Sequence, residues 1–425
     1  MRVYKNAAVY REGKLRVEDV AVDDGKFKAV GEDASRIPIS PRDKVIDCEG
    51  KLLTPGLADV HVHLRQPGFS YKETIETGTL AAARGGFTVI CAMPNLNPVP
   101  DCYHNLEAEL DIIRESARVR VLPYGTLTKG RKGSGVPAEY GEMARYVAGF
   151  TDDGTGVQDR ELMRLCMRGI KPTGRLAVAH CEDDSLLCGG YVHAGRFALA
   201  NGHAGICSQS EWKQLARDVE LAKEVGCPYH ACHLSTAESI AIIRKAKSEG
   251  MDVSCETAPH YLALCDEDIS DDGRFKMNPP IRSRRDMEAI IQGVADRTID
   301  MIATDHAPHS AKEKSGGLRG SAMGVVGLET AFAVMYTRLV LRGFITLERL
   351  LELMCDAPRK RFGLPGGIAP GEVWEMSLFD LDAPYIIDPS RFASMGRATP
   401  FEGMEVKGRA IETVVAGKVV YTGDL

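Results

Sequence analysis

The sequence lacks the features of a membrane protein or a secreted protein. None of its apolar runs approaches the roughly 18 to 20 residues that cross a bilayer. Its first residues, MRVYKN, predict a short strand and not the charged and apolar regions of a signal peptide. The twelve cysteines include no Cys-x-x-Cys pair, and many lie inside apolar runs, which is typical of buried, reduced thiols. We therefore expect a cytoplasmic protein with no membrane partner.

The sequence also lacks a block of basic residues. Lysine and arginine number 53 against 59 acidic residues, which gives a formal net charge of -6. Nucleic acids and anionic lipid surfaces attract concentrated positive charge, so this composition argues against both as main partners. At 425 residues the chain exceeds one small domain, and a large domain with a smaller one is the natural expectation.

Short apolar segments bounded by turn-forming residues recur through the middle of the chain. Eight of them predict buried strands, at 57–64, 87–93, 119–126, 146–151, 175–180, 228–234, 251–257 and 299–304. Helical segments separate several of them, and Ser70-x-x-Glu73 and Ser235-x-x-Glu238 predict the capping boxes that begin two helices. Eight strands alternating with helices favour a closed (β/α)₈ TIM barrel, here over residues 56–365. An open doubly wound sheet is disfavoured because no Gly-x-Gly-x-x-Gly follows the first strand.

The two ends of the chain have a different pattern from the middle. Residues 1–55 and residues 366–425 both consist of short strand-like segments separated by polar turns. We predict that the two ends form one small β-sandwich-like domain, which the C-terminal segment completes.

His61 and His63 stand at the end of the first predicted strand. Side chains alternate along a strand, so these two imidazoles point to the same face, a short step apart. Potential metal ligands also stand at the ends of later strands: Asp153, His180, His233 and Asp305. Because the strands of such a barrel run parallel, all six side chains converge at its C-terminal mouth.

Four imidazoles and two carboxylates exceed the three protein ligands that a single catalytic zinc ion needs. They suit two divalent ions with one carboxylate between them, Zn²⁺ first and Mn²⁺ or Co²⁺ as alternatives. Two such ions can share a hydroxide and polarise a carbonyl, which predicts a hydrolase. A histidine that stands alone is more often structural, and we assign that role to His104, His193, His203, His230, His260 and His306, with contact to a ligand as the alternative for His260.

Several motifs together resemble the amidohydrolase superfamily, and more closely its bacterial-type dihydroorotase family. They are the first-strand motif 59–65, AMPNLNPV, GFTDDG at 149–154, AHCE at 179–182, ATDHAPH at 303–309 and PFEG at 400–403. The resemblance runs along nearly the whole chain. It implies a barrel with two zinc ions that interconverts N-carbamoyl-L-aspartate and L-dihydroorotate in pyrimidine (UMP) biosynthesis.

The resemblance also implies which residues hold each ion. His61, His63 and Asp305 would bind one ion, and His180 and His233 the other. Many relatives bridge the two with a carboxylated lysine at the end of the fourth strand, but this chain has no lysine there. It resembles the subgroup in which an aspartate takes that role. On that pattern we choose Asp153, and expect its neighbour Asp152 to support the site or the fold.

Arg65 lies two residues beyond His63, and therefore on the same face at the rim of the barrel. Its planar guanidinium suits a carboxylate held by two hydrogen bonds, although a surface ion pair would be the expectation for an arginine alone. By resemblance, substrate contacts come from His63, Arg65, Asn95, Asn278, His309, Met323 and Gly324. Asp305 would be the general acid and base that serves the hydroxide between the ions. The segment 310–324, rich in Gly, Ser and Lys, predicts a mobile lid.

Two alternative functions remain open from the sequence. One is another cyclic-amide hydrolase, similar to dihydropyrimidinase or allantoinase, although such relatives usually carry the lysine bridge. The other is a non-catalytic dihydroorotase-like partner of aspartate transcarbamoylase, which the retention of all six ligands disfavours. For an active enzyme, the resemblance is compatible with a homodimer and with docking to that transferase.

Overall fold

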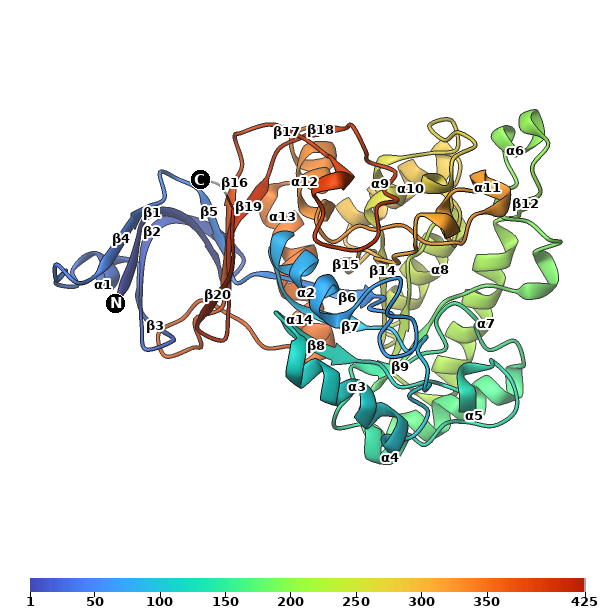
Figure 1. Ribbon diagram of the computed structural model, residues 1–425. Coiled ribbons are helices and arrows are strands. Elements are labelled where there is room, and N and C mark those ends of the chain that lie inside the picture. The colour runs from blue at the N-terminus through green and yellow to red at the C-terminus, as the bar shows by residue number, and fades with distance from the viewer. Residues whose placement is uncertain (424–425) are drawn as a thin grey trace.

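Residues 1–423, which the computed structural model describes, contain a barrel of eight parallel strands beside a β domain (Figure 1). The barrel strands are β6 (Leu57–Val62), β7 (Phe87–Ala92), β8 (Arg120–Pro123), β9 (Gly149–Phe150), β10 (Leu176–Ala179), β13 (Tyr229–Ala231), β14 (Val253–Thr257) and β15 (Met301–Ile302). Each falls inside one of the eight segments predicted from the sequence. Their residues are almost all buried, as expected for strands covered on both faces.

The strands pair in two parallel arcs that two bridges close into a barrel. One arc has the order β6-β7-β8 and the other the order β15-β14-β13-β10-β9. Single parallel bridges join Gly125 to Phe150 and Val62 to His306, which connect the ends of the arcs. The closed barrel that the strand count favoured is therefore confirmed, and the open sheet is excluded.

Helices follow the strands and cover the outside of the barrel (Figure 1). The principal ones are α2 (Ile75–Arg84), α3 (Tyr103–Ser116), α4 (Tyr140–Met143), α5 (Arg160–Ile170), α7 (Gln209–Val225), α8 (Ala237–Ser248), α10 (Arg284–Ala295), α12 (Ala331–Met335), α13 (Leu347–Leu351) and α14 (Ala357–Phe362). Within residues 1–423, no helix combines the length and the apolar character needed to cross a bilayer. The twelve cysteines are free thiols and most are buried, as expected.

The predicted capping boxes were wrong by a few residues. Thr74 is the N-cap of helix α2, and its side chain accepts the amide of Thr77; Thr236 is the N-cap of α8. Glu73 is fully buried and binds Ser394, so it does not fold back on Ser70. Both threonines still obey the capping rule, because a side-chain oxygen satisfies an amide of the first turn.

The β domain is one curved sheet made from both ends of the chain, at the left of Figure 1. Its strands are β1 (Arg2–Arg11), β2 (Lys14–Asp23), β3 (Lys26–Val30), β4 (Lys44–Asp47), β5 (Leu52–Thr54), β16 (Met376–Asp380), β19 (Arg409–Val415) and β20 (Lys418–Thr422). The order is β20-β19-β16-β5-β1-β2-β3, with β4 also paired to β1. Because β5 pairs with β16, the N-terminal and C-terminal strands complete one sheet, as predicted.

Candidate active site

The six predicted ligands lie together at the C-terminal ends of the barrel strands. His61 is in β6 and His63 follows it, and the later strands position the others in the same way. The remaining four follow β9, β10, β13 and β15, and are Asp153, His180, His233 and Asp305. All six are at least nine-tenths buried. Parallel strands that end at one edge therefore place the whole cluster inside the barrel mouth.

Asp153 lies at the centre of this cluster. Its Oδ1 is 3.3 Å from His61 Nε2 and 3.6 Å from His233 Nε2, and its Oδ2 is 3.5 Å from His63 Nε2. His180 Nδ1 is slightly farther from Oδ1, at 3.9 Å. Burial raises the pKa of Asp153, but the imidazoles of His61, His233 and His63 together hold it well below its usual value. One ionised carboxylate therefore faces four imidazoles.

The adjacent Asp152 has a different environment. Its carboxylate accepts the amides of Leu127, Thr128 and Gly133 and the hydroxyl of Thr128. These hydrogen bonds occupy both oxygens and tie the fourth strand end to the preceding loop. Asp152 therefore holds the backbone that presents Asp153.

Asp305 faces the cluster from the opposite side of the mouth. Its Oδ1 is 3.1 Å from His63 Nε2 and 3.5 Å from His61 Nε2. The backbone of Asp305 has φ 48°, and His233 and Arg65 also have positive φ, at 32° and 63°. Residues other than glycine rarely adopt this left-handed conformation, and such strain is typical of functional sites.

Glu256, which was not among the predicted site residues, and Asn95, which was predicted to contact substrate, orient the first two histidines. The carboxylate of Glu256, on β14, accepts a hydrogen bond from His61 Nδ1 at 2.7 Å. The side-chain oxygen of Asn95 is 2.7 Å from His63 Nδ1. With Nδ1 protonated in each ring, the lone pair of Nε2 points toward Asp153 and Asp305. Both rings are therefore set to present Nε2 as a ligand atom.

The donor set fits divalent metal ions. Three groups of possible ligand atoms lie within 4.8 Å of one another, and two of them consist only of predicted ligands: His61, His63 and Asp305, and His61, Asp153 and His233. The third group is His61, Cys232 and Glu256. His61 Nε2 and Asp153 Oδ1 are buried and have no hydrogen-bond partner within residues 1–423. Buried polar atoms without partners are costly, and a cation between them satisfies both. The group with Asp153 and His233 differs from the predicted pairing, because it contains His61 in place of His180.

His180 remains in direct contact with this cluster. Its Nδ1 is 3.0 Å from His233 Nε2, and its Nε2 lies 3.6 Å from Glu182. The Nδ1 atom is therefore the one that faces Asp153.

A cavity of about 190 Å³ opens directly above the cluster. Four of the predicted ligands line it: Asp153, His180, His233 and Asp305. Every residue predicted to contact substrate lines it, namely His63, Arg65, Asn95, Asn278, His309, Met323 and Gly324. The structure thus brings the predicted substrate contacts and every predicted ligand except His61 to the lining of one cavity.

Arg65 forms the positively charged wall of this cavity. Its Nε donates to the carbonyl of Pro308 at 3.2 Å, and it forms no ion pair with any residue in 1–423. Burial lowers the pKa of Arg65 to about 10, so the guanidinium stays charged at neutral pH. The remaining N–H groups are available for an anionic ligand.

His309 stands beside Arg65 as a neutral imidazole. Its Nε2 donates to the carbonyl of Met323 at 2.8 Å, and its Nδ1 accepts from Lys72 at 3.2 Å. Burial, with Arg65 and Lys72 nearby, lowers the pKa of His309 to about 3. The contribution of Lys72 to this site could not be predicted from the sequence, because nothing in the residues around it distinguishes it from a surface lysine.

Asn278 and the segment 310–324 cover another side of the cavity. The Asn278 amide donates to Glu182 at 2.9 Å, and its side-chain oxygen is buried without a hydrogen-bond partner among the described residues. The segment contains two short helical turns, Lys312–Lys314 and α11 (Gly317–Gly320). The ammonium of Lys314 donates to three carbonyls, including that of Gly324 at 2.7 Å. These bonds hold the backbone of Gly324 at the cavity wall.

Three of the histidines assigned to structural roles are buried near the site without belonging to the ligand cluster. His230 lies below the site, where its Nε2 is 3.1 Å from Glu256. His306 accepts the amide of Gly327, and its other ring nitrogen faces Glu73 at 3.5 Å. Burial lowers the pKa of His260 to about 4, which keeps this buried ring neutral.

Comparison with known proteins identifies the family. The Dihydro-orotase-like family model matches residues 50–239. A dihydroorotase of Bacillus cereus (strain AH820) is 46% identical over 427 residues, which cover 99% of this chain and 98% of the relative. The chain belongs to the dihydroorotase family. A dihydroorotase of Bacillus thuringiensis (strain Al Hakam) matches with the same identity and coverage.

Solved structures of related enzymes share the fold of this dihydroorotase family member. The L-hydantoinase (dihydropyrimidinase) from Arthrobacter aurescens has a TM-score of 0.89 at 27% identity, over 100% of this chain and 97% of that one. A dihydropyrimidinase from Brevibacillus agri NCHU1002 has a TM-score of 0.84 at 21% identity, over 99% and 95%. The barrel with a sheet-rich domain is therefore the fold of these amidohydrolases.

Proposed function

We propose that this protein catalyses the reversible cyclisation of N-carbamoyl-L-aspartate to L-dihydroorotate in pyrimidine biosynthesis. One observation carries the proposal: a single cavity combines the buried His/Asp cluster with Arg65, a charged guanidinium that has no acidic partner. The cluster suits attack on a cyclic amide, and Arg65 suits a substrate carboxylate. Membership of the dihydroorotase family supports the same reaction.

The cluster would hold two divalent ions, with zinc as the first choice for its imidazole and carboxylate donors. The proposed ligands are His61, His63, Asp153, His180, His233 and Asp305, with Asp153 between the two ions. When bound, the ions would supply a nucleophilic hydroxide at neutral pH and polarise the amide carbonyl.

Asp305 would move the proton. In ring opening, water adds to the amide carbonyl carbon, the C–N bond breaks and the ring nitrogen takes up a proton. Burial raises the pKa of Asp305, but His61 and His63 hold it well below its usual value, so it begins as a carboxylate that can accept the proton from water. The same group then donates the proton to the leaving nitrogen, and in cyclisation these transfers run in reverse.

Arg65, His309 and Asn95 would orient the substrate carboxylate at the rim of the cavity. A neutral His309 adds no positive charge, so Arg65 carries the recognition of the anion. Asn278 and the backbone of Met323 and Gly324 would contact the ring. Closure of the segment 310–324 over substrate would exclude water and strengthen these interactions.

The deciding experiment compares substrates with and without the carboxylate. Purified, metal-replete protein should open L-dihydroorotate at least about 100-fold more efficiently than dihydrouracil, hydantoin or allantoin, because two charge-assisted hydrogen bonds are lost with the carboxylate. Arg65→Gln should remove most of this preference, and Arg65→Lys should keep part of it. Faster turnover of dihydrouracil would favour a dihydropyrimidinase instead.

Metal analysis tests the non-catalytic alternative. We expect two zinc ions per chain and turnover that a chelator abolishes and zinc restores. Protein that binds no metal and turns over no cyclic amide would instead favour a silent partner of aspartate transcarbamoylase.

A further inference from the structure

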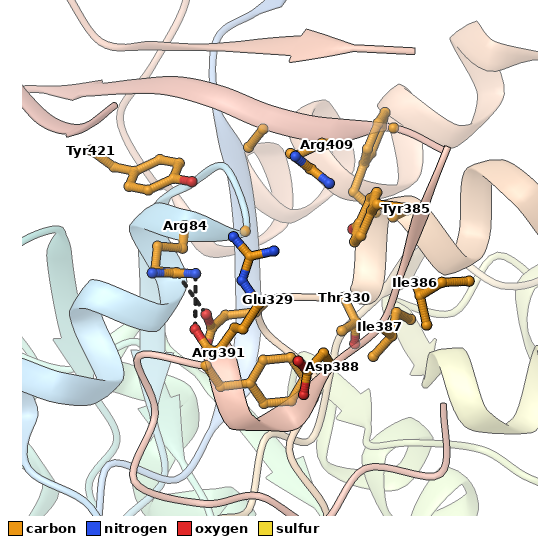
Figure 2. Close-up of a pocket in the computed structure, with 16 residues that line it drawn as sticks. Arg84, Glu329, Thr330, Tyr385, Ile386, Ile387, Asp388, Arg391, Arg409 and Tyr421 are labelled. Atoms are coloured by element: carbon orange, nitrogen blue, oxygen red, sulfur yellow. Dashed lines mark hydrogen bonds and ion pairs between the residues drawn. The ribbon is translucent and has the colours of Figure 1, made fainter. Parts of the chain in front are cut away.

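A second cavity, of about 100 Å³, lies at the seam between the barrel and the C-terminal part of the chain. Helices α2 and α12 form its barrel side, and the segment from β17 (Tyr385–Ile386) to Arg409 forms the other side. It shares no lining residue with the cavity above the metal ligands. Figure 2 shows three arginine side chains gathered around it, Arg84, Arg391 and Arg409.

The charge of Arg84 is already neutralised. Its Nε is 2.8 Å from a carboxylate oxygen of Glu329, and it also donates to the carbonyl of Arg391 at 3.0 Å. Glu329 in turn accepts the amides of Ala393 and Ser394 at 2.9 and 3.2 Å. Arg84 and Glu329 therefore form a fixed wall with little net charge.

Arg391 and Arg409 are not neutralised in this way. Neither guanidinium forms an ion pair or a side-chain hydrogen bond with any residue in 1–423. The other acidic group of the lining, Asp388, accepts the amide of Ser390 at 2.9 Å. The Ser390 hydrogen bonds and the nearby Arg391 guanidinium lower the pKa of Asp388, although the two side chains form no ion pair within residues 1–423. The lining thus carries an excess of positive charge.

Arg409 is also held in place for binding. Its guanidinium carbon lies 4.4 Å from the centroid of the Tyr385 ring, and this cation–π contact restrains the side chain while its N–H groups form no hydrogen bond within residues 1–423. A restrained guanidinium loses less side-chain entropy when it forms two parallel hydrogen bonds. This arrangement is that of a preorganised anion site.

We propose that this seam cavity binds a small phosphate-type oxyanion, either free phosphate or the phosphate group of a small monoester. The forks of Arg391 and Arg409 would each donate two hydrogen bonds, and the cavity volume limits the ligand to a compact group. The bound anion would join the helical turn Pro389–Arg391 to the start of strand β19 at Arg409. The proposal is independent of the reaction at the metal ligands.

Titration calorimetry with inorganic phosphate, at constant ionic strength set with chloride, tests the proposal. The metal-replete protein should bind phosphate saturably at the seam and melt at a higher temperature in its presence. The double variant Arg391→Gln/Arg409→Gln should lower this affinity at least about tenfold, the loss expected from charge-assisted hydrogen bonds. Ribose 5-phosphate in a second titration separates the two sources, because a monoester site binds it at least as tightly as phosphate.

Two control variants test whether the loss of phosphate affinity is specific to the seam arginines. Arg36→Gln removes an exposed arginine of the β domain, paired with Glu32, and should leave phosphate affinity unchanged. Arg65→Gln removes the guanidinium of the metal-site cavity and should leave the seam component of phosphate binding unchanged, which separates the two cavities. Selenate in crystals of the unaltered protein should give anomalous density between Arg391 and Arg409. Equal phosphate affinity in the double variant and the parent, or anomalous density only elsewhere, would overturn the proposal.

Discussion

The barrel mouth and the core of the β domain are equally buried but opposite in chemistry. His61 and Leu53 are both fully excluded from solvent. Leu53 lies in an apolar cluster with Tyr4, Val9 and Met376, where burial itself supplies the stability. His61 instead lies among carboxylates and imidazoles, and its Nε2 has no hydrogen-bond partner in the described part of the chain. Burial therefore does not distinguish the two regions, whereas the convergence of several potential metal-ligand atoms on one point does.

The largest expected effect separates chemistry from stability at the mouth. Asp305→Asn removes a group that can accept a proton and keeps its shape. Turnover of L-dihydroorotate should fall by about 10²–10⁴-fold, the usual contribution of a positioned acid or base. Substrate affinity and the melting temperature of the metal-free protein should change little. Near-normal turnover in a variant that has its full complement of metal would refute the role of Asp305.

A substitution in the core of the β domain should have the opposite result and affect stability alone. Leu53→Ala removes buried methyl groups and leaves a cavity in the sheet core, which should lower the free energy of unfolding by about 2–5 kcal/mol. Denaturant titration measures this loss. Metal affinity and turnover of the folded fraction should match those of the parent. A large change in metal affinity would show that the two regions are coupled, contrary to the comparison.

Glu256→Gln is a smaller change, which tests how the mouth is organised. The amide oxygen can still accept from His61 Nδ1, but the negative charge that favours this tautomer is lost. Zinc affinity, measured by chelator competition, should fall about 10–100-fold, the usual cost of losing such a supporting carboxylate. The visible spectrum of the cobalt-loaded variant should also shift, because the imidazole becomes a weaker ligand.

Glu109 provides a matched control for Glu256. Its carboxyl is equally buried, in helix α3, but neither of its oxygens has a hydrogen-bond partner within residues 1–423. Burial raises the pKa of Glu109 well above its usual value, so it is neutral, and Glu109→Gln replaces one neutral group with another. Zinc affinity should not change. Equal losses in the two variants would mean that Glu256 acts only through stability.

The smallest expected effect concerns pH. The pKa of His309 is about 3 in the folded protein against roughly 6.5 in an unfolded chain. Between these values the unfolded chain binds a proton that the folded protein does not, so stability falls as pH decreases below about 6.5. The slope from this one group is at most roughly 1.4 kcal/mol per pH unit. His309→Gln should reduce the slope of unfolding free energy between pH 4 and 6; an unchanged slope would contradict a neutral, buried His309.

The strands and the ligand cluster could be predicted from local sequence because each signal is local. A barrel strand is recognised in the sequence as a short apolar run, and the ligand at the end of the strand is the polar residue that follows this run. Once the parallel order is inferred, strand ends must meet, so His61 and Asp305 could be placed together without coordinates. The fold was predictable for the same reason.

Partners that act across the barrel could not be predicted in this way. Glu256 stands in a run of buried strand residues, and only the closed barrel brings it to His61, 195 positions away. The helix starts failed for a related reason: Glu73 is recruited by Ser394 from the far end of the chain. The seam arginines are likewise brought together only by tertiary structure.

The pairing of β5 with β16 has a consequence for how the protein is made. Strands β1 to β5 leave the ribosome first, but the neighbour that covers the edge of β5 is synthesised only after the entire barrel. During synthesis that edge presents unpaired amides and carbonyls, which are a template for association with other chains. The C-terminal strands thus cover the edge of β5 only at the end of synthesis. A nascent chain stalled before Met376 would depend on chaperones to stay soluble.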